Sequence, residues 1–367
     1  MEQMTRTGLA WDEWFMWHVT GVAGGLVPYG NYVQPHHFVE DPEPKRRIKH
    51  LLDRSGMTAR MVPVKVRPAS EAELCYFHTP EYVALVREGS KGEGGMAGPF
   101  TPFGTDTFEI ASRAVGALLE CVDDVIDGKI DNAFAFLRPP GHHAQSHQGL
   151  GMCIFGNIAI AAHHARYIRN LPRVAVIDYD AHHGNGVQEA FYSDPSVLTI
   201  SLHQRTWFGI GGEISERGEG AGDGSSINIP MPSGTGDGGY IAAFERVVIP
   251  ALRQFQPDII LVAAGFDISA FDIVSTMMVS SEGFRTINQM LVDAAKELCG
   301  GRIVLELEGG YNPWATPFAV LASIEALSGV RTEVKDPFLD FTVGSIDNQL
   351  LDHQAAVIEE VRVAFDL

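Results

Sequence analysis

Residues 174–186 read VAVIDYDAHHGNG, a short β-branched apolar run that changes abruptly into acidic, histidine and glycine residues. Such a run is typical of a strand that is buried on both faces of a parallel sheet. Four further runs of this kind cover residues 133–137, 197–201, 259–263 and 303–305. Because the carboxyl ends of parallel strands meet at one edge of a sheet, the polar residues that follow these runs are expected to gather there.

Segments with helical spacing separate the strands, and each is long enough to cross over a sheet. They cover residues 157–169, 240–255 and 281–298. The alternation predicts a single-domain α/β fold, with a mainly parallel, doubly wound sheet flanked by helices. Residues 43–54 and 107–126 are also predicted helices, and the basic residues of the first are expected on a solvated face. A last helix is expected at 348–365, in a C-terminal extension, 331–367, packed on a domain that spans residues 1–367.

The composition narrows the class of protein. The chain has 367 residues, of which 45% are hydrophobic and 20% charged, as in globular proteins. Its formal charge of -19 should repel phosphate backbones and anionic lipid heads, which argues against nucleic-acid and membrane partners. The four cysteines form no CxxC pair and no leader or long apolar run is visible, so we expect a reducing, cytoplasmic location.

Three polar residues after the run at 174–177 have the pattern of metal ligands. Asp178, Asp180 and His182 alternate at spacing two, so an extended backbone points all three to one side. Two carboxylates repel each other without a cation, and two carboxylates with an imidazole suit a catalytic Zn²⁺ or Fe²⁺. Asp267 is the best candidate for a further ligand from another strand, because it is a lone acid after the apolar run IILVAAGF. A single strand-end aspartate is as often a helix cap or a loop acceptor, but the whole set argues for a metal.

Two more strand ends carry groups that can move or donate a proton. His142 and His143 follow Pro139, Pro140 and Gly141, whose tight turn would hold both imidazoles against the same crevice. Imidazole titrates near neutrality, so it can take a proton from water and return it to a leaving amine. Tyr311 follows two glycines and can donate to a developing oxyanion.

The strings RPPGHHA, DYDAHHGNGVQEAFYSDPSVLTISLH, GFD followed by Asp272, and LEGGYNP resemble the histone deacetylase superfamily, in particular class II enzymes and bacterial histone-deacetylase-like amidohydrolases. The resemblance extends from about Trp11 to Val330. It implies an arginase/deacetylase fold and zinc-dependent hydrolysis of an N-acyl amide, such as acetyl-lysine or an acetylpolyamine, to acetate and a free amine. The partner would be a small-molecule or peptide acyl-amide substrate.

The resemblance also implies a role for each matching residue. One zinc ion would be bound by Asp180, His182 and Asp267. The catalytic groups would be His143 as general base and then acid, His142 as its electrostatic partner, Asp178 orienting His142, Asn185 beside His143 where class I relatives have an aspartate, and Tyr311 polarising the acyl carbonyl. A structural K⁺ would use Asp178, Ser201 and the carbonyls of Asp180, His182 and Leu202, and a second monovalent ion the backbone around Phe191, Asp194 and Val197.

Family members bind substrate in a narrow apolar tube with two facing aromatic residues. The matching positions here are Met152, which follows Gly151, and Phe208, so one ring of the pair is replaced by a flexible thioether. We expect a wall at Met152 that adapts to acyl groups or amines that a clamp of two rings would exclude.

Two alternatives remain open. A binuclear manganese ureohydrolase shares this kind of sheet, but its pattern needs a second bridging aspartate where this chain has Gly184. A non-catalytic module that binds acylated ligands would have no need of His142, His143 and Tyr311 beside a metal. The glycine-rich loops and residues 20–40 are candidates for the substrate entrance or for the contact of a homo-oligomer.

Overall fold

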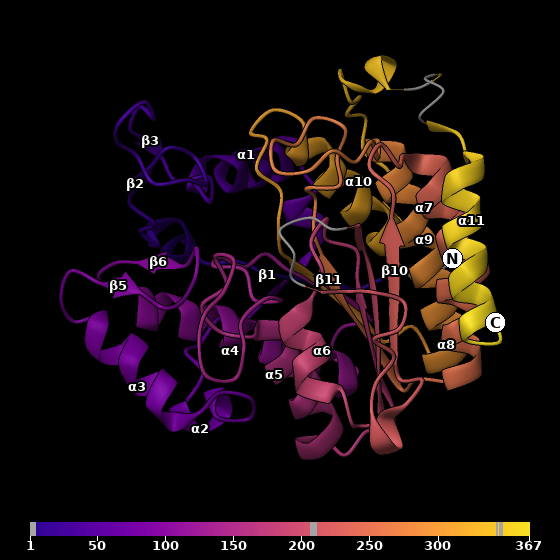
Figure 1. The fold of residues 1–367 in the computed structure, drawn as a ribbon, viewed down its shortest axis with the longest axis horizontal. Helices are drawn as coiled ribbons and strands as arrows, with labels where there is room; N and C mark the ends of the chain where they lie inside the picture. Colours follow the sequence, from indigo (N-terminus) through magenta and orange to yellow (C-terminus); the bar gives the residue numbers. More distant parts are fainter. Residues whose placement is uncertain (1–4, 206–210, 343, 345–347) are drawn as a thin grey trace.

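A computed structural model describes residues 5–205, 211–342, 344 and 348–367, and its centre is an eight-stranded sheet (Figure 1). Every neighbouring pair of these strands is parallel. The order across the sheet is β10 (Ser226–Met231), β9 (Val197–Gln204), β8 (Val174–Asp178), β11 (Ile259–Ala264), β12 (Ile303–Leu307), β7 (Asn132–Ala135), β1 (Thr7–Ala10) and β4 (Val62–Val64). The mainly parallel α/β sheet predicted from the sequence is confirmed.

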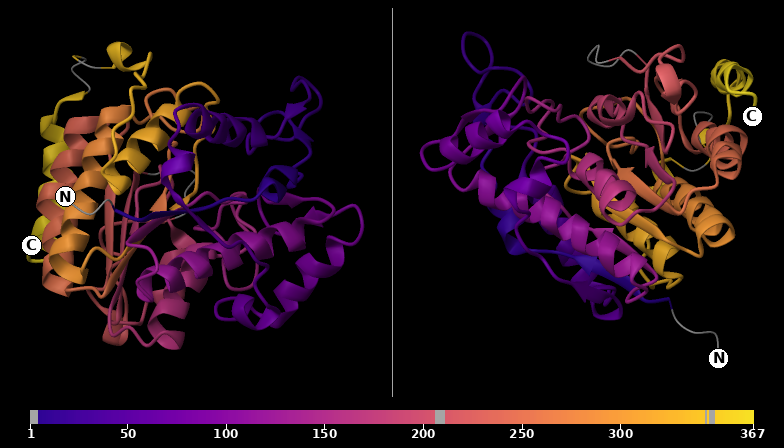
Figure 2. Two further views of the ribbon diagram at one scale, coloured as in Figure 1. Left: turned by 180° about the vertical axis from the view of Figure 1, so that it is seen from behind. Right: turned by 90° about the horizontal axis from the view of Figure 1, so that it is seen from below.

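Helices cover both faces of the sheet, and each face has its own apolar core (Figures 1 and 2). One core includes side chains of α1 (Pro42–Arg54), α7 (Asp237–Ala243), α8 (Ile249–Phe255), α9 (Ser281–Cys299), α10 (Thr316–Ser328) and α11 (Asp352–Ala364). The other includes side chains of α2 (Glu71–Leu74), α3 (Pro80–Gly89), α4 (Thr107–Ile126), α5 (Asn157–His163) and α6 (Asn185–Phe191). The sheet is therefore doubly wound.

Strand β11 illustrates why its sequence is apolar throughout. Ile260, Val262 and Ala264 pack in the first core, while Ile259, Leu261 and Ala263 pack in the second. Since successive side chains point to opposite faces, a strand with helices on both sides needs apolar residues at every position.

Five of the strands lie at the runs that the sequence indicated, and three were missed. β1 contains Gly8, β4 contains Pro63 and β10 contains Pro230, each of which weakens a strand pattern. The two prolines lie in β4 and β10, the edge strands of the sheet, where proline is tolerated because one side of the strand needs no partner. Gly8 has no room for a side chain, since an added Cβ would lie 2.6 Å from Cδ1 of Ile130.

The predicted helices are present with three corrections. The helices at 157–169 and 240–255 continue through π-helical segments, η3 (His164–Ile168) and η5 (Phe244–Val248). The last helix begins at Asp352 rather than 348, because the Asn348 side chain instead accepts a hydrogen bond from the first residue of α7, Asp237 N, at 3.2 Å. The basic residues of α1 do not all face solvent, since Lys45 is buried.

Two short antiparallel hairpins extend from the N-terminal half of the chain: β2 (Val22–Ala23) with β3 (His36–His37), and β5 (Gly95–Met96) with β6 (Pro102–Phe103). Each carries a loop toward the carboxyl edge of the sheet. Among the described residues, no helix has the length and apolar character needed to cross a membrane.

Candidate active site at the carboxyl edge of the sheet

Asp180, His182 and Asp267, the three metal ligands implied by the family resemblance, converge beyond the ends of β8 and β11, whereas Asp178 contacts His142 instead. Nδ1 of His182 lies 2.9 Å from Oδ1 of Asp180 and 3.0 Å from Oδ2 of Asp267. All three side chains are buried. Backbone amides fix the carboxylates, because Ala181 N donates to Oδ1 of Asp267 at 2.9 Å and Gly309 N donates to Oδ2 of Asp180 at 3.0 Å. Residues 180–182 form a bend rather than the extended backbone expected from the spacing of two, and within it His182 N donates to Oδ1 of Asp180 at 2.9 Å, so the cluster is held in place by backbone hydrogen bonds.

The cluster fits a divalent cation. A single N–H of His182 cannot be directed at both carboxylates, and Oδ2 of Asp267 accepts no well-directed hydrogen bond within the described part of the chain. Burial, and then the neighbouring Asp180 carboxylate, raises the pKa of Asp267 to about 7. Two carboxylates and an imidazole are a ligand set that Zn²⁺ accepts, and a cation there would stabilise both charges.

The tandem histidines lie beside this cluster, with ring centroids 3.9 Å apart and ring planes tilted by 36°. Nδ1 of His142 is 2.9 Å from Oδ2 of Asp178, whereas Nδ1 of His143 is 2.8 Å from Oδ1 of Asn185. Burial opposes charge on His142, but the carboxylates of Asp180 and Asp178 raise its pKa well above 6.5. Burial, and then the charges of His142 and His182, lowers the pKa of His143 well below 6.5. These two shifts favour the charged form of His142 and the neutral form of His143.

A buried glutamate that the sequence analysis did not assign holds the histidine turn. Oε2 of Glu308 accepts a hydrogen bond from Gly141 N at 2.7 Å, directly before His142. Burial raises the pKa of Glu308. The sequence could have indicated this role, because Glu308 directly follows β12 and precedes two glycines. A carboxylate buried at the end of a strand needs a hydrogen-bond donor.

Tyr311 is held on a turn that packs closely on the metal-ligand cluster. A Cβ at Gly309 would lie 2.6 Å from carboxylate oxygens of both Asp180 and Asp267, and Gly310 has a φ of +127°. Gly309 is thus needed because the turn passes close to the two carboxylates, and Gly310 because its backbone has a positive φ. Oδ2 of Asp272 accepts hydrogen bonds from Tyr311 N at 2.7 Å and from Asn312 N at 3.3 Å, a role not seen in the sequence.

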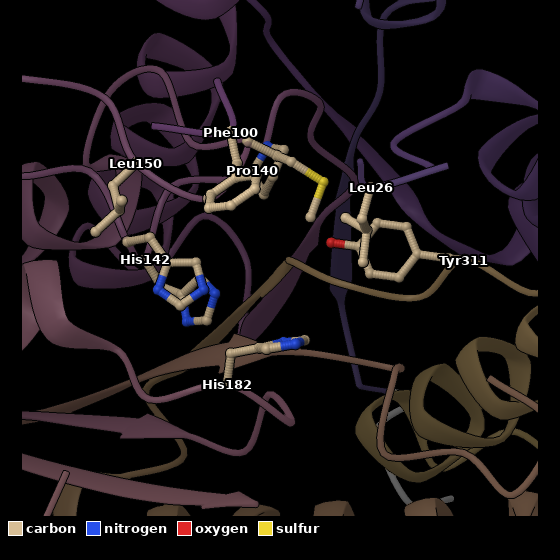
Figure 3. Close-up of a pocket in the computed structure, with 10 residues that line it drawn as sticks. Leu26, Phe100, Pro140, His142, Leu150, His182 and Tyr311 are labelled. Carbon is tan, nitrogen blue, oxygen red and sulfur yellow. The ribbon is translucent and has the colours of Figure 1, made fainter. Parts of the chain in front are cut away.

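A cavity of about 90 Å³ leads to these groups. Figure 3 shows Tyr311 and His142 on opposite sides of it, with His182 between them and the phenol oxygen directed inward. The remaining lining is largely apolar and comprises Leu26, Phe100, Pro140, His143, Leu150, Gly151 and Met152. The arrangement brings two neighbouring imidazoles, a phenol and the cluster of Asp180, His182 and Asp267 to the end of one apolar tube.

The walls of the tube include residues that the sequence analysis did not assign. Gly151 and Met152 line it as expected, but so does Phe100, an aromatic residue from the β5–β6 loop, and Leu26 from the β2–β3 loop. Phe100 is thus an aromatic residue of the wall that the sequence analysis did not assign, and the role expected of Phe208 stays a prediction. Phe208 itself lies outside the described residues.

The predicted potassium residues are close in the fold. Asp178 and Ser201 are register partners on β8 and β9, and both line a small cavity of about 10 Å³. Asp180, His182 and Leu202 follow on the same two strand ends. The second set lies in the turn between α6 and β9, where Asp194 N donates to the Phe191 carbonyl at 3.0 Å and Val197 N to the Asp194 carbonyl at 3.4 Å.

The surroundings of Gly184 argue against a binuclear manganese ureohydrolase. A Cβ added to Gly184 would lie 2.2 Å from Oδ2 of Asp178. There is no room here for the second bridging aspartate that a binuclear ureohydrolase needs.

Sequence comparison agrees with this geometry, since a histone deacetylase domain matches residues 38–327. The chain belongs to the histone deacetylase family. It is 41% identical to a histone deacetylase-like amidohydrolase of Pseudomonas aeruginosa, over 99% of this chain and 97% of that protein. It is also 37% identical to the human polyamine deacetylase HDAC10, over 89% of this chain and 47% of that protein.

A solved structure of this deacetylase family has the same architecture. The crystal structure of the HDA15 HD domain superposes with a TM-score of 0.86 and 30% identity, covering 98% of this chain and 96% of that one. The family and fold predicted from the sequence motifs are thus confirmed, and the chain is an enzyme of the deacetylase and amidohydrolase class.

Proposed function

We propose that this deacetylase hydrolyses N-acyl amides, such as acetyl-lysine or acetylpolyamines, with one zinc ion bound by Asp180, His182 and Asp267. The observation that carries the proposal is the convergence of that cluster with His143 and Tyr311 at the end of an apolar tube. The bound metal would act as a Lewis acid and lower the pKa of a water molecule.

The side chains supply the proton transfers. Neutral His143 accepts the proton of the attacking water and later gives it to the departing amine, while Asn185 holds its ring by the 2.8 Å contact. Burial, and then the charge of the neighbouring His142, which Asp178 holds, lowers the pKa of His143 and so favours its uncharged form before reaction. The phenol of Tyr311 donates to the carbonyl oxygen as negative charge develops on it. The apolar lining excludes water from the acyl group and so favours these interactions.

The proposal extends to the structural ions. Asp178, Ser201 and the carbonyls of Asp180, His182 and Leu202 would bind one K⁺, and the turn containing Phe191, Asp194 and Val197 a second. The buried Asp178 carboxylate beside the 10 Å³ cavity supports the first site. Turnover in buffers containing K⁺ should exceed turnover in buffers containing only a bulky organic cation.

The decisive experiment measures hydrolysis of a fluorogenic acetyl-lysine amide and of acetylated polyamines by the purified enzyme. We expect turnover that is lost on dialysis against a chelator and restored by about one equivalent of Zn²⁺ per chain. Undiminished turnover in metal-free enzyme would exclude the mechanism. A metal content of two per chain would instead favour the ureohydrolase, and binding without turnover the non-catalytic module.

We also propose a cellular location and a subunit contact. The four cysteines form no disulfide, which supports a reducing, cytoplasmic location. Exposed apolar side chains at Val27, Tyr29 and Tyr32 support a subunit contact through residues 20–40. Light scattering on the purified chain would test whether a homo-oligomer forms.

A further inference from the structure

Lys45 is a lysine in the first half of α1 with only 1% of its surface exposed. Its Nζ lies 3.3 Å from the carbonyl oxygen of Gly310, to which it donates, and 4.7 Å from the centroid of the Tyr311 ring. The third partner is Oε1 of Glu40 at 3.4 Å. Two of the three contacts of this buried ammonium group are therefore made to the turn that carries the proposed oxyanion donor.

The surrounding charges show that Lys45 is not simply one half of an ion pair. Arg138 already pairs with the same Glu40 oxygen that Lys45 contacts, with Nε 2.9 Å from Oε1, and both the Arg138 and Glu40 side chains are fully buried. The same guanidinium donates to the carbonyls of Phe15 at 2.9 Å and His18 at 2.8 Å. His18 adds no positive charge, because burial and then Arg138 lower its pKa to about 3. The cluster thus holds two cations, Arg138 and Lys45, against one close carboxylate.

An extra buried cation is costly to desolvate unless it has other partners. Here those partners are the Gly310 carbonyl and the π face of the Tyr311 ring. Asp272 fixes the same turn through the Tyr311 amide. The turn is therefore held between a carboxylate on its backbone amide and an ammonium on its carbonyl and ring.

We propose that Lys45 is a positioning residue for Tyr311, an inference that rests on the proposed function. Its ammonium group fixes the phenol in the direction of the acyl oxygen, and its charge under the ring favours donation to an oxyanion. Since a misplacement of about 1 Å costs about 100-fold in rate, loss of Lys45 should affect turnover far more than substrate binding.

The test compares Lys45→Met, which keeps length but removes charge, with Lys45→Arg, which keeps charge. Lys45→Met should lower kcat by about 10-fold or more with little change in KM, and Lys45→Arg should restore part of the loss. Lys49→Met is the matched control. Lys49 lies one turn further along α1 with its Nζ 5.6 Å from the centroid of the Trp11 ring, so this variant should keep wild-type kcat.

A double-mutant cycle distinguishes positioning from a general structural effect. If Lys45 acts through the phenol, Lys45→Met should cause no further loss of kcat in the Tyr311→Phe background. Equal fold losses in both backgrounds, or a wild-type kcat for Lys45→Met, would overturn the proposal. Should Lys45→Met fail to fold, Lys45→Gln in the same cycle decides the matter by the same criteria.

The two proposals fail in different ways. Wild-type turnover in Tyr311→Phe would remove the role of Tyr311, and the role of Lys45 with it. Slow turnover in Tyr311→Phe with unimpaired Lys45→Met would remove the role of Lys45 alone.

Discussion

Replacing Asn185 by aspartate should shift the pH dependence of the enzyme, because this side chain contacts the proposed base. In the wild type, Oδ1 of Asn185 lies 2.8 Å from Nδ1 of His143, and burial with the neighbouring His142 and His182 keeps the pKa of His143 well below 6.5. The acid limb of kcat/KM should accordingly lie below the pH at which histidine usually titrates.

The magnitude follows from the distance. Charges about 4 Å apart interact by about 4 kcal/mol at an effective dielectric constant of about 20, which corresponds to about 3 pKa units. Burial of the new carboxylate offsets part of this gain, so we expect Asn185→Asp to raise the pKa of His143 by about 1 to 3 units. A raised pKa means that the base form is lost earlier as the pH falls, and the acid limb therefore moves to higher pH.

The assay is kcat/KM for a fluorogenic acetyl-lysine amide between about pH 5 and 9. Asn185→Leu is the control, since it removes the amide without adding charge and should slow the reaction without raising the acid limb. An acid limb in Asn185→Asp that coincides with that of the wild type, in a folded and metal-loaded protein, would refute the assignment of His143 as the base.

Three other outcomes are expected. Tyr311→Phe should lower kcat by about 100-fold or more while metal content stays at the wild-type level, and near-normal turnover would remove its role. Met152→Phe should reduce turnover of propionyl and longer amides more than that of acetyl amides, and identical profiles would contradict an adaptable wall. Ile358→Ala should lower the free energy of unfolding by about 2 to 5 kcal/mol in urea denaturation, because Ile358 of α11 is fully buried; a change near zero would show that α11 contributes little to stability.

The sequence predicted the centre of the fold better than its edges. β11 and the part of β8 before Asp178 are apolar at every position because helices cover both their faces, and that pattern is local. β4 and β10 contain proline, which is acceptable only because each lies at an edge, and edge position depends on the complete strand order. The order of strands in a sheet cannot be inferred from the sequence pattern of any single strand.

The same distinction applies to the site. Asp180 and His182 were predicted together because their spacing alone directs both to one side of an extended backbone. Leu26 and Phe100 come from loops without periodicity, so nothing in their neighbours indicated that they line the tube. Lys45 was expected in solvent because its main partner in the site, Gly310, is 265 residues away in the chain.

One wall of the tube is joined to its neighbour mainly by hydrogen bonds between main-chain atoms, with one further donation from Met152 N to the Thr101 hydroxyl at 3.3 Å. Gly151 N donates to the Pro99 carbonyl and Met152 N to the Phe100 carbonyl, both at 3.0 Å. These bonds do not depend on which side chains the two loops carry. A single replacement at position 100 or 152 can therefore change the width of the tube while the backbone of its wall, and His143 and Tyr311 behind it, stay in place. The preference for one acyl group over another can then differ between related enzymes that keep the same reaction.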